Sequence, residues 1–259
     1  MIRRRLYAEE RFSPLARWSF RLALFCLPVV ALSAILYRTG LLDFTPAVVT
    51  LAAGLGLALL AAILGTVAFF ITWETGWLGI GRAIAAVAIA VAVLAGPAAV
   101  LARGMMLPRL TDITTDSADP PRFRGLALAH PRESNPLQYP GTEAATAQRL
   151  AYPGIKPVDL SATPEEAFNA VLALVQKRHW RILDAIPPRG TRRDGQIEAV
   201  AESPLMGFRS DVVIRIRPTP KGARVDARSA ARYGIHDLGT NAQRIESLMA
   251  DLATERRKR

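Results

Sequence analysis

Three long apolar spans lie within the first 103 residues, and no comparable span follows them. They run from about residue 18 to 37, from 47 to 72 and from 80 to 102, and none has a charged residue at its centre. Each is long enough to cross a hydrocarbon layer about 30 Å thick, which takes about 20 helical residues. The pattern predicts a transmembrane domain of three helices over residues 1–103. The lack of central charges argues against a transporter or a proton relay.

Basic residues flank the first span unequally. Five arginines lie between residues 3 and 17, whereas the loop after the span has only Arg38 against Asp43. Because short flanks rich in Lys and Arg stay in the cytoplasm, we expect a cytoplasmic N-terminus. An odd number of spans then places residues 103–259 on the other side, which in a bacterium is the periplasmic face of the inner membrane.

A cleaved signal peptide is the alternative interpretation of the first span. Ala31-Leu32-Ser33 loosely resembles a small-residue cleavage site. The long leader contains Glu9 and Glu10, however, and the apolar run continues past Ser33. We therefore favour a retained helix, and cleavage would not alter the sidedness of the rest.

The second span has small residues at helical spacing, namely Gly54, Ala58, Ala61 and Gly65. Such a stripe lets another helix backbone approach closely. Two uses remain open: packing within a three-helix bundle, or association with a second copy of the chain as a homo-oligomer.

Residues 104–158 are rich in proline and turn formers but are punctuated by aromatic and aliphatic residues. We expect an extended strap that lies on the following domain, with one short helix over about 143–150, capped by Thr142. Three aspartates, Asp112, Asp116 and Asp119, lack the alternation, the glycine and the terminal glutamate of a calcium loop. Turn formation is the simpler interpretation.

Residues 159–259 have the pattern of a folded α+β core. Thr163-Pro164 with Glu166 predicts a capped helix that ends near residues 177–179, and Thr240 with Gln243 three residues on is expected to cap a final helix. Between them, strands are expected at about 180–184, 196–202, 210–217 and 223–233. The predicted fold is a helix, a four-stranded antiparallel meander and a helix.

The formal net charge of +11 and the pI of about 10.7 would suggest nucleic acid in a soluble protein. Nine of the 33 basic and four of the 22 acidic residues lie in residues 1–103, which leaves a net charge of +6 beyond them. A periplasmic domain does not meet nucleic acid. Its cationic surface suits anionic lipid or cell-wall polymer, or it is solvated without a partner.

Several segments resemble the DUF1499 family, a family of domains of unknown function. They are DITTDSADPPRF at 112–123, the paired YPG motifs within 139–157, GFRSDVVIRIRP at 207–218 and VDARSAARYGIHDLGTNAQRI at 225–245. The similarity covers most of residues 111–250 and implies no activity. Two positions depart from the family pattern: Ala231 replaces a usual Ser, and Ser210 replaces a frequent Asp.

The last of these segments places polar residues around one strand-to-helix turn. An ion-pair and capping network that locks the turn explains all of them, and an anion site built from Arg228, Arg232 and the helix amides is the alternative. Gly239 would supply a position with positive φ. The candidate residues are Asp211, Arg228, Ser229, Arg232, Asp237, Asn241 and Arg244.

Three further arginines, Arg215, Arg217 and Arg224, should share one face of two adjacent strands. We expect this basic face to have a weak, salt-sensitive affinity for anionic headgroups or cell-wall polymer.

No catalytic motif is recognisable. His130, His179 and His236 lack the spacing of metal ligands, and the lone Cys26 lies inside the first span. We expect no metal, no cofactor and a non-enzymatic binding or scaffolding domain. The alternative is an envelope hydrolase or transferase. A pocket in which Arg228, Arg232, His236 and Asp237 converge would favour ligand binding or chemistry, and a filled turn would favour scaffolding.

Overall fold

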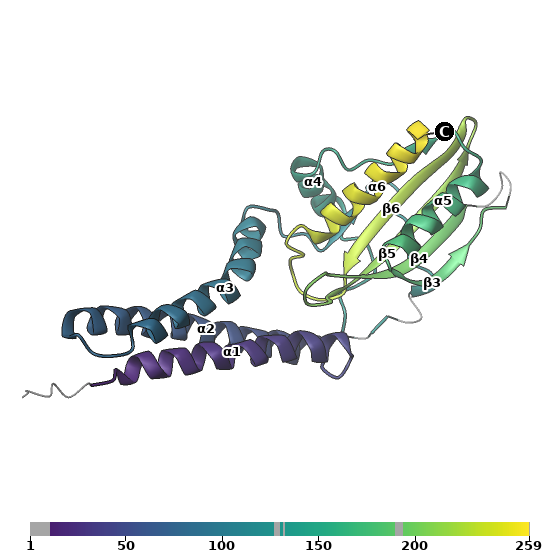
Figure 1. Ribbon diagram of the computed structural model, residues 1–259. Coiled ribbons are helices and arrows are strands. Elements are labelled where there is room, and N and C mark those ends of the chain that lie inside the picture. The colour runs from purple at the N-terminus through teal and green to yellow at the C-terminus, as the bar shows by residue number, and fades with distance from the viewer. Residues whose placement is uncertain (1–10, 127–129, 132, 190–193, 259) are drawn as a thin grey trace, which may run out of the picture. The chain divides into compact units, whose positions relative to one another are not determined.

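The computed structural model describes residues 11–126, 130–131, 133–189 and 194–258 (Figure 1). The chain forms two compact units, Met1–Leu101 and Ala102–Arg259. Each unit is described by itself.

The first unit contains the predicted apolar helices. They are α1 (Pro14–Arg38), α2 (Phe44–Thr75) and α3 (Ile80–Met105), whose last turn belongs to the second unit. All three are long and apolar enough to cross a membrane. The first begins earlier than its apolar run because the Ser13 hydroxyl accepts a hydrogen bond from the Ala16 amide at 3.3 Å. Helix α1 also runs without a break through Ala31–Ser33.

The small-residue stripe of α2 is buried inside the bundle. A Cβ atom at Gly54 would lie 2.7 Å from the Val30 side chain of α1, and one at Gly65 would lie 2.9 Å from the Val87 side chain of α3. Ala58 and Ala61 are fully buried. Because α1 and α3 of the same chain fill these positions, the stripe packs the bundle, and in this arrangement it is not available to a second copy.

One end of the bundle gathers basic residues. Phe12 forms an isolated bridge with Leu78 in the loop between α2 and α3, and the guanidinium groups of Arg17 and Arg82 lie 5.4 and 4.5 Å from its ring centroid. Arg11 accepts a hydrogen bond from the Leu78 amide through its carbonyl. The arginines at positions 3–5 lie outside the described residues.

The second unit contains an antiparallel sheet and three helices. In chain order the elements are β1 (Asp112–Thr114), α4 (Thr142–Ala151), β2 (Val158–Leu160), α5 (Pro164–Lys177), β3 (Arg181–Ile186), β4 (Gly195–Glu202), β5 (Arg209–Thr219), β6 (Gly222–Ala231) and α6 (Thr240–Lys258). The strand order is β1-β6-β5-β4-β3, and β2 also pairs with β6.

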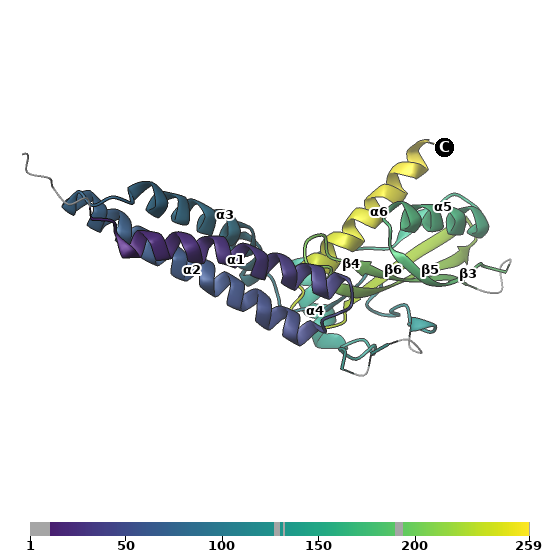
Figure 2. The same cartoon turned by 60° about the horizontal axis from the view of Figure 1, so that its bottom comes forward.

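Helices α5 and α6 cover one face of the sheet (Figure 2). Alternate residues of the long strands point to this face, for example Val212, Ile214 and Ile216 of β5, and they join the apolar sides of both helices in the core. The predicted capping box of α5 is confirmed, with hydrogen bonds in both directions between Thr163 and Glu166.

The sheet has six strands, two more than the sequence pattern predicted. The additional strands β1 and β2 come from the Pro-rich strap and pair with β6. Each has only three residues, which is too short for an alternation pattern to be recognised. Strand β2 packs closely against Gly222, where a Cβ atom would lie 2.1 Å from the Leu160 carbonyl oxygen. Gly222 also has a φ of 139°, so both the space and the backbone conformation favour glycine.

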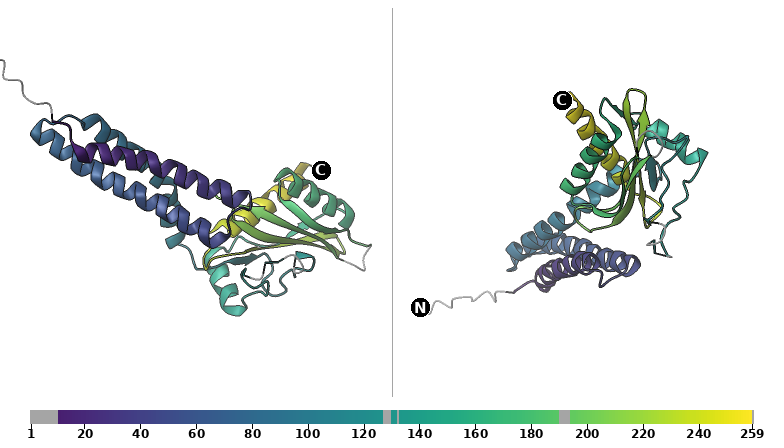
Figure 3. Two further views of the ribbon diagram at one scale, coloured as in Figure 1. Left: turned by 90° about the horizontal axis from the view of Figure 1, so that it is seen from below. Right: turned by 90° about the vertical axis from the view of Figure 1, so that its right-hand side faces the viewer.

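The strap and α4 lie on the face of the sheet that α5 and α6 leave free (Figure 3, left). This second face is polar: Glu198 of β4, Arg215 and Arg217 of β5, and Asp226 and Arg228 of β6 are all on it. Helix α4 begins at Thr142 itself, with Gly141 at the N-cap and no side-chain cap, so the predicted cap by Thr142 is wrong.

Candidate functional site

The candidate polar residues around the β6–α6 turn separate into several groups with different partners. In the first group, the buried Asp211 carboxylate accepts from Arg232 Nε and Nη2 at 2.8 and 2.7 Å through one oxygen. Its other oxygen lies 3.1 Å from His130 Nδ1. The second ring nitrogen of His130 lies 2.9 Å from the Asn135 carbonyl oxygen. Both ring nitrogens of His130 therefore lie within hydrogen-bond distance of an acceptor oxygen.

A second group caps α6. The Asp237 carboxylate accepts from the amides of Gly239 at 3.0 Å and Asn241 at 2.7 Å. Burial raises the pKa of Asp237, and these two hydrogen bonds act against the shift. The predicted cap by Thr240 is wrong: its hydroxyl instead donates to the Asp237 carbonyl. Gly239 has the expected positive φ, 81°.

A third group lies beneath the first turns of α6. The Ser229 hydroxyl donates to Asn241 Oδ1 at 2.8 Å, and Arg244 Nη1 donates to both side chains. Burial lowers the pKa of Arg244 to about 10, and the charge of Asp237 acts against this shift. The side chains of this group thus bind one another, and Asn241 Nδ2 also donates to the Thr111 carbonyl at 2.8 Å.

Arg228 belongs to none of these groups, because it points to the opposite face of the sheet from Ser229. Its guanidinium forms a bidentate ion pair with Asp112 of β1, with Nε–Oδ1 and Nη2–Oδ2 distances of 3.0 and 2.7 Å. It also donates to the carbonyls of Pro121 at 3.1 Å and Leu137 at 2.7 Å. Only 3–4% of either charged side chain is exposed, and Arg228 binds three parts of the strap, at Asp112, Pro121 and Leu137, to the sheet.

The three arginines of the predicted basic face do lie together, but they are neutralised by acids. The fully buried Asp226 forms ion pairs with all three. From the strap, Asp119 pairs with Arg215 and Arg217, and Asp116 pairs with Arg217 and Arg224. Burial acts to raise the pKa of Asp116, but backbone hydrogen bonds and Arg217 outweigh it and lower the pKa. Three arginines therefore face three aspartates, and little net charge is left for a partner.

The sequence pattern did not single out Glu198, whose side chain is fully buried on β4. Its carboxylate accepts from the amides of Arg124 and Leu126, each at 2.6 Å, and from Gln196 Nε2 at 2.5 Å. These bonds fix the strap across the polar face. Only the mixed polarity of strand 196–202 could have suggested such a role, since the backbone amides that Glu198 binds lie over 70 positions away.

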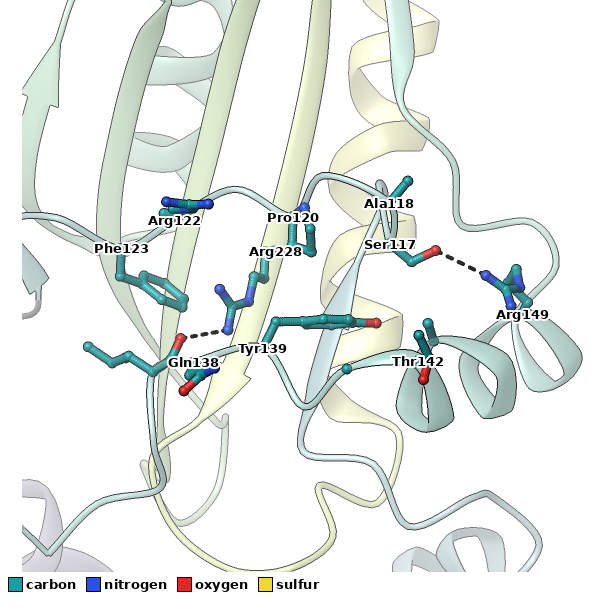
Figure 4. Close-up of a pocket in the computed structure, with 13 residues that line it drawn as sticks. Ser117, Ala118, Pro120, Arg122, Phe123, Gln138, Tyr139, Thr142, Arg149 and Arg228 are labelled. Atoms are coloured by element: carbon teal, nitrogen blue, oxygen red, sulfur yellow. Dashed lines mark hydrogen bonds between the residues drawn. The ribbon is translucent and has the colours of Figure 1, made fainter.

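A hollow of about 820 Å³ opens between helix α4 and two other segments of the strap, residues 117–123 and 137–141 (Figure 4). Arg228 lies at its wall, with its guanidinium 4.8 Å from the ring centroid of Phe123 and 5.5 Å from that of Tyr139. The remaining lining is a mixture of apolar and polar groups: Ser117, Ala118, Pro120, Arg122, Leu137, Gln138, Gly141, Thr142, Ala145 and Arg149.

The side chains that line the hollow include hydrogen-bond donors and cations, and none of the described lining residues is an Asp or Glu. Arg122 and Arg149 are exposed, and neither forms an ion pair with any residue that the structure describes. Among the described residues, Arg149 donates to the hydroxyls of Ser117 at 3.4 Å and Thr146 at 3.1 Å. The Gln196 side chain fixes the Arg122 backbone by donating to its carbonyl at 3.0 Å.

The Tyr139 hydroxyl is buried and has no hydrogen-bond partner among the described residues. Burial raises the pKa of Tyr139, and the negative charge of Asp112 raises it further, so the hydroxyl keeps its proton as a donor. Figure 4 shows this hydroxyl directed toward the α4 side of the hollow, where the first turn of the helix has no side-chain cap.

Within the described ranges, no three His, Cys, Asp or Glu side chains lie close enough together to hold a metal ion. The fold and the hollow thus define a polar-faced α+β domain that follows three apolar helices. The chain belongs to the DUF1499 family, described as a protein of unknown function, whose model matches residues 112–252. No curated protein and no solved structure matches the chain.

Proposed function

We propose that this protein is a multi-pass inner-membrane protein whose DUF1499 domain lies on the periplasmic side and binds an anionic amphiphile. The observation that carries the proposal is the lining of the hollow, which combines the rings of Phe123 and Tyr139 with two arginines, Arg122 and Arg149, that form no ion pair with a described residue. Cations and donors suit a phosphate or carboxylate, and ring faces suit the apolar part of the same molecule. The ligand class that combines both is an anionic lipid.

The β6–α6 turn supports a role in holding the fold together and not in binding a ligand. Arg228, Arg232, His236 and Asp237 do not converge, because their partners are Asp112, Asp211, the Gly104 carbonyl and the α6 amides. The lining of the hollow has no His, Cys or carboxylate among its described members, so a binding role is favoured over hydrolysis or transfer.

A binding experiment tests the ligand class. The full chain in a nonionic detergent is titrated calorimetrically with short-chain phosphatidylglycerol and with the matching phosphatidylcholine. We expect the anionic lipid to bind at least tenfold more tightly. Each basic residue near an anionic group contributes about 1 kcal/mol, so Arg122→Gln with Arg149→Gln should weaken binding about thirtyfold.

The matched control is the double substitution Lys177→Gln with Arg181→Gln. It also removes two exposed positive charges, but neither residue lines the hollow. An equal loss in the control, or no binding of either lipid, would contradict the proposal. Binding of a soluble muramyl peptide in place of the lipid would assign the site to cell-wall polymer. Release of a product from either probe, followed by mass spectrometry, would favour the hydrolase or transferase alternative.

The proposed sidedness has support from the first unit. Arg11, Arg17 and Arg82 gather where the N-terminal segment meets the α2–α3 loop, as the positive-inside rule requires of a cytoplasmic end. Alkaline phosphatase fused after Arg259 should be active, and a fluorescent protein that matures only in the cytoplasm should stay dark there. The reverse pair of results would overturn this orientation.

A further inference from the structure

Three large apolar side chains of the second unit are almost fully exposed around a single contact. Met105 and Met106 at the end of α3 are 85% and 87% exposed, and Ile235 in the β6–α6 loop is 79% exposed. An exposed cluster of this kind is costly in water and marks a surface that is covered in use.

The contact joins the β6–α6 loop to the end of α3. His236 Nε2 lies 2.9 Å from the Gly104 carbonyl oxygen, and the Leu238 amide donates to His236 Nδ1 at 3.1 Å. Nδ1 therefore accepts a hydrogen bond, and Nε2 is the ring nitrogen that donates to the Gly104 carbonyl. Leu238 also packs so closely on Gly104 that a Cβ atom there would lie 2.3 Å from its Cδ2 atom.

Further bonds make this attachment rigid. The Asp237 amide donates to the Leu110 carbonyl at 3.1 Å, and Gly239 lies so close to Leu107 that a Cβ atom would come within 2.6 Å of its Cδ1 atom. Leu238 adopts a φ of 53°, which a non-glycine residue rarely does. Residues 236–239 of the loop are thus held against residues 104–110 by hydrogen bonds and close packing.

The position of Gly104 decides what covers the cluster. Gly104 lies in the last turn of α3, a helix long and apolar enough to cross a membrane, so an α3 that spans the bilayer places Gly104 at its surface. Ile235 adjoins His236, and Met105 and Met106 adjoin Gly104. Arg103 and Arg109 are exposed nearby and form no ion pair with a described residue. Apolar side chains flanked by arginines are typical of segments that lie in the headgroup region.

We propose that Met105, Met106 and Ile235 insert into the boundary between headgroups and acyl chains, and that the β6–α6 loop is a membrane-docking element of the domain. Arg103 and Arg109 then face the lipid phosphates. The proposal does not depend on the ligand of the hollow, because it uses other residues and needs only that α3 spans the bilayer.

The test places a fluorescent probe on the loop. In full-length protein with Cys26→Ala, a single Ile235→Cys is labelled with an environment-sensitive maleimide and reconstituted into nanodiscs of phosphatidylcholine and phosphatidylglycerol. The matched control is Lys221→Cys, exposed in the β5–β6 hairpin at the other end of β6, roughly 30 Å away by strand rise.

We expect the probe at position 235 to emit at shorter wavelength than the probe at 221, to be protected from aqueous iodide, and to be quenched by lipids spin-labelled near the headgroup. Iodide access at 235 equal to that at 221 would overturn the proposal. Protection from iodide without quenching by spin-labelled lipid would also overturn it, since a protein surface, such as a second copy of the chain, would then cover the loop.

Discussion

The ion pair between Arg228 and Asp112 is the strongest single test of how the strap is held. Arg228→Ala removes the guanidinium but leaves the Asp112 carboxylate buried. It also deprives the carbonyls of Pro121 and Leu137 of their donor and leaves a gap between the rings of Phe123 and Tyr139.

The magnitude follows from burial. Both charged side chains are at most 4% exposed, so the substitution leaves an uncompensated charge out of water, which costs about 3–5 kcal/mol. Domains are stable by only about 5–15 kcal/mol. For a unit of this size, such a loss lowers the melting temperature by roughly 6–20 °C.

Hydrogen exchange of the full chain in detergent measures the effect, read on the amides of β5 and β6, which open with the whole domain. The matched control is Arg224→Ala on the same strand. Its side chain is 38% exposed, and Asp226 keeps Arg215 and Arg217, so we expect a loss within about 1 kcal/mol.

A double substitution separates the pair from its surroundings. Replacing both charges, as Asp112→Leu with Arg228→Met, should cost less than Arg228→Ala alone, because no charge stays buried without a partner. If Arg228→Ala destabilises the domain no more than Arg224→Ala does, then the ion pair does not hold the strap and the reasoning is refuted.

Three further substitutions test other parts of the domain by thermal unfolding and hydrogen exchange. The pKa of Asp116 is lowered in the fold, so its contribution to stability is present above its ordinary pKa and lost as pH falls through the folded value. Asp116→Asn should therefore be less stable than wild type at neutral pH, and the difference should close in acid; a difference independent of pH would contradict this. Asp237→Ala removes the α6 cap and should cost about 1 kcal/mol, with faster exchange in the first turn of α6. Gly222→Ala should cost more than about 1 kcal/mol, because a Cβ atom meets the Leu160 carbonyl at a positive φ; wild-type stability would show that β2 can move aside.

Local patterns in the sequence were sufficient for much of the architecture. The three apolar spans, the capping box of Thr163 and Glu166, and the alternation along β5 and β6 each depend on neighbours a few residues apart. Their physical basis is the period of a helix or strand and the fixed reach of a capping side chain, which any stretch of chain reveals by itself. The long motif at 225–245 likewise identified the family.

The tertiary structure alone decided which charges meet. Arg228 pairs with Asp112, which is 116 positions away, and Glu198 bonds backbone amides more than 70 positions away. The seven residues around the strand-to-helix turn looked like one site, but alternate residues of β6 point to opposite faces, so they divide among separate partners. The hollow also depends on how the strap crosses the polar face of the sheet. That path is fixed by long-range ion pairs and backbone hydrogen bonds, and no local pattern of residues encodes it.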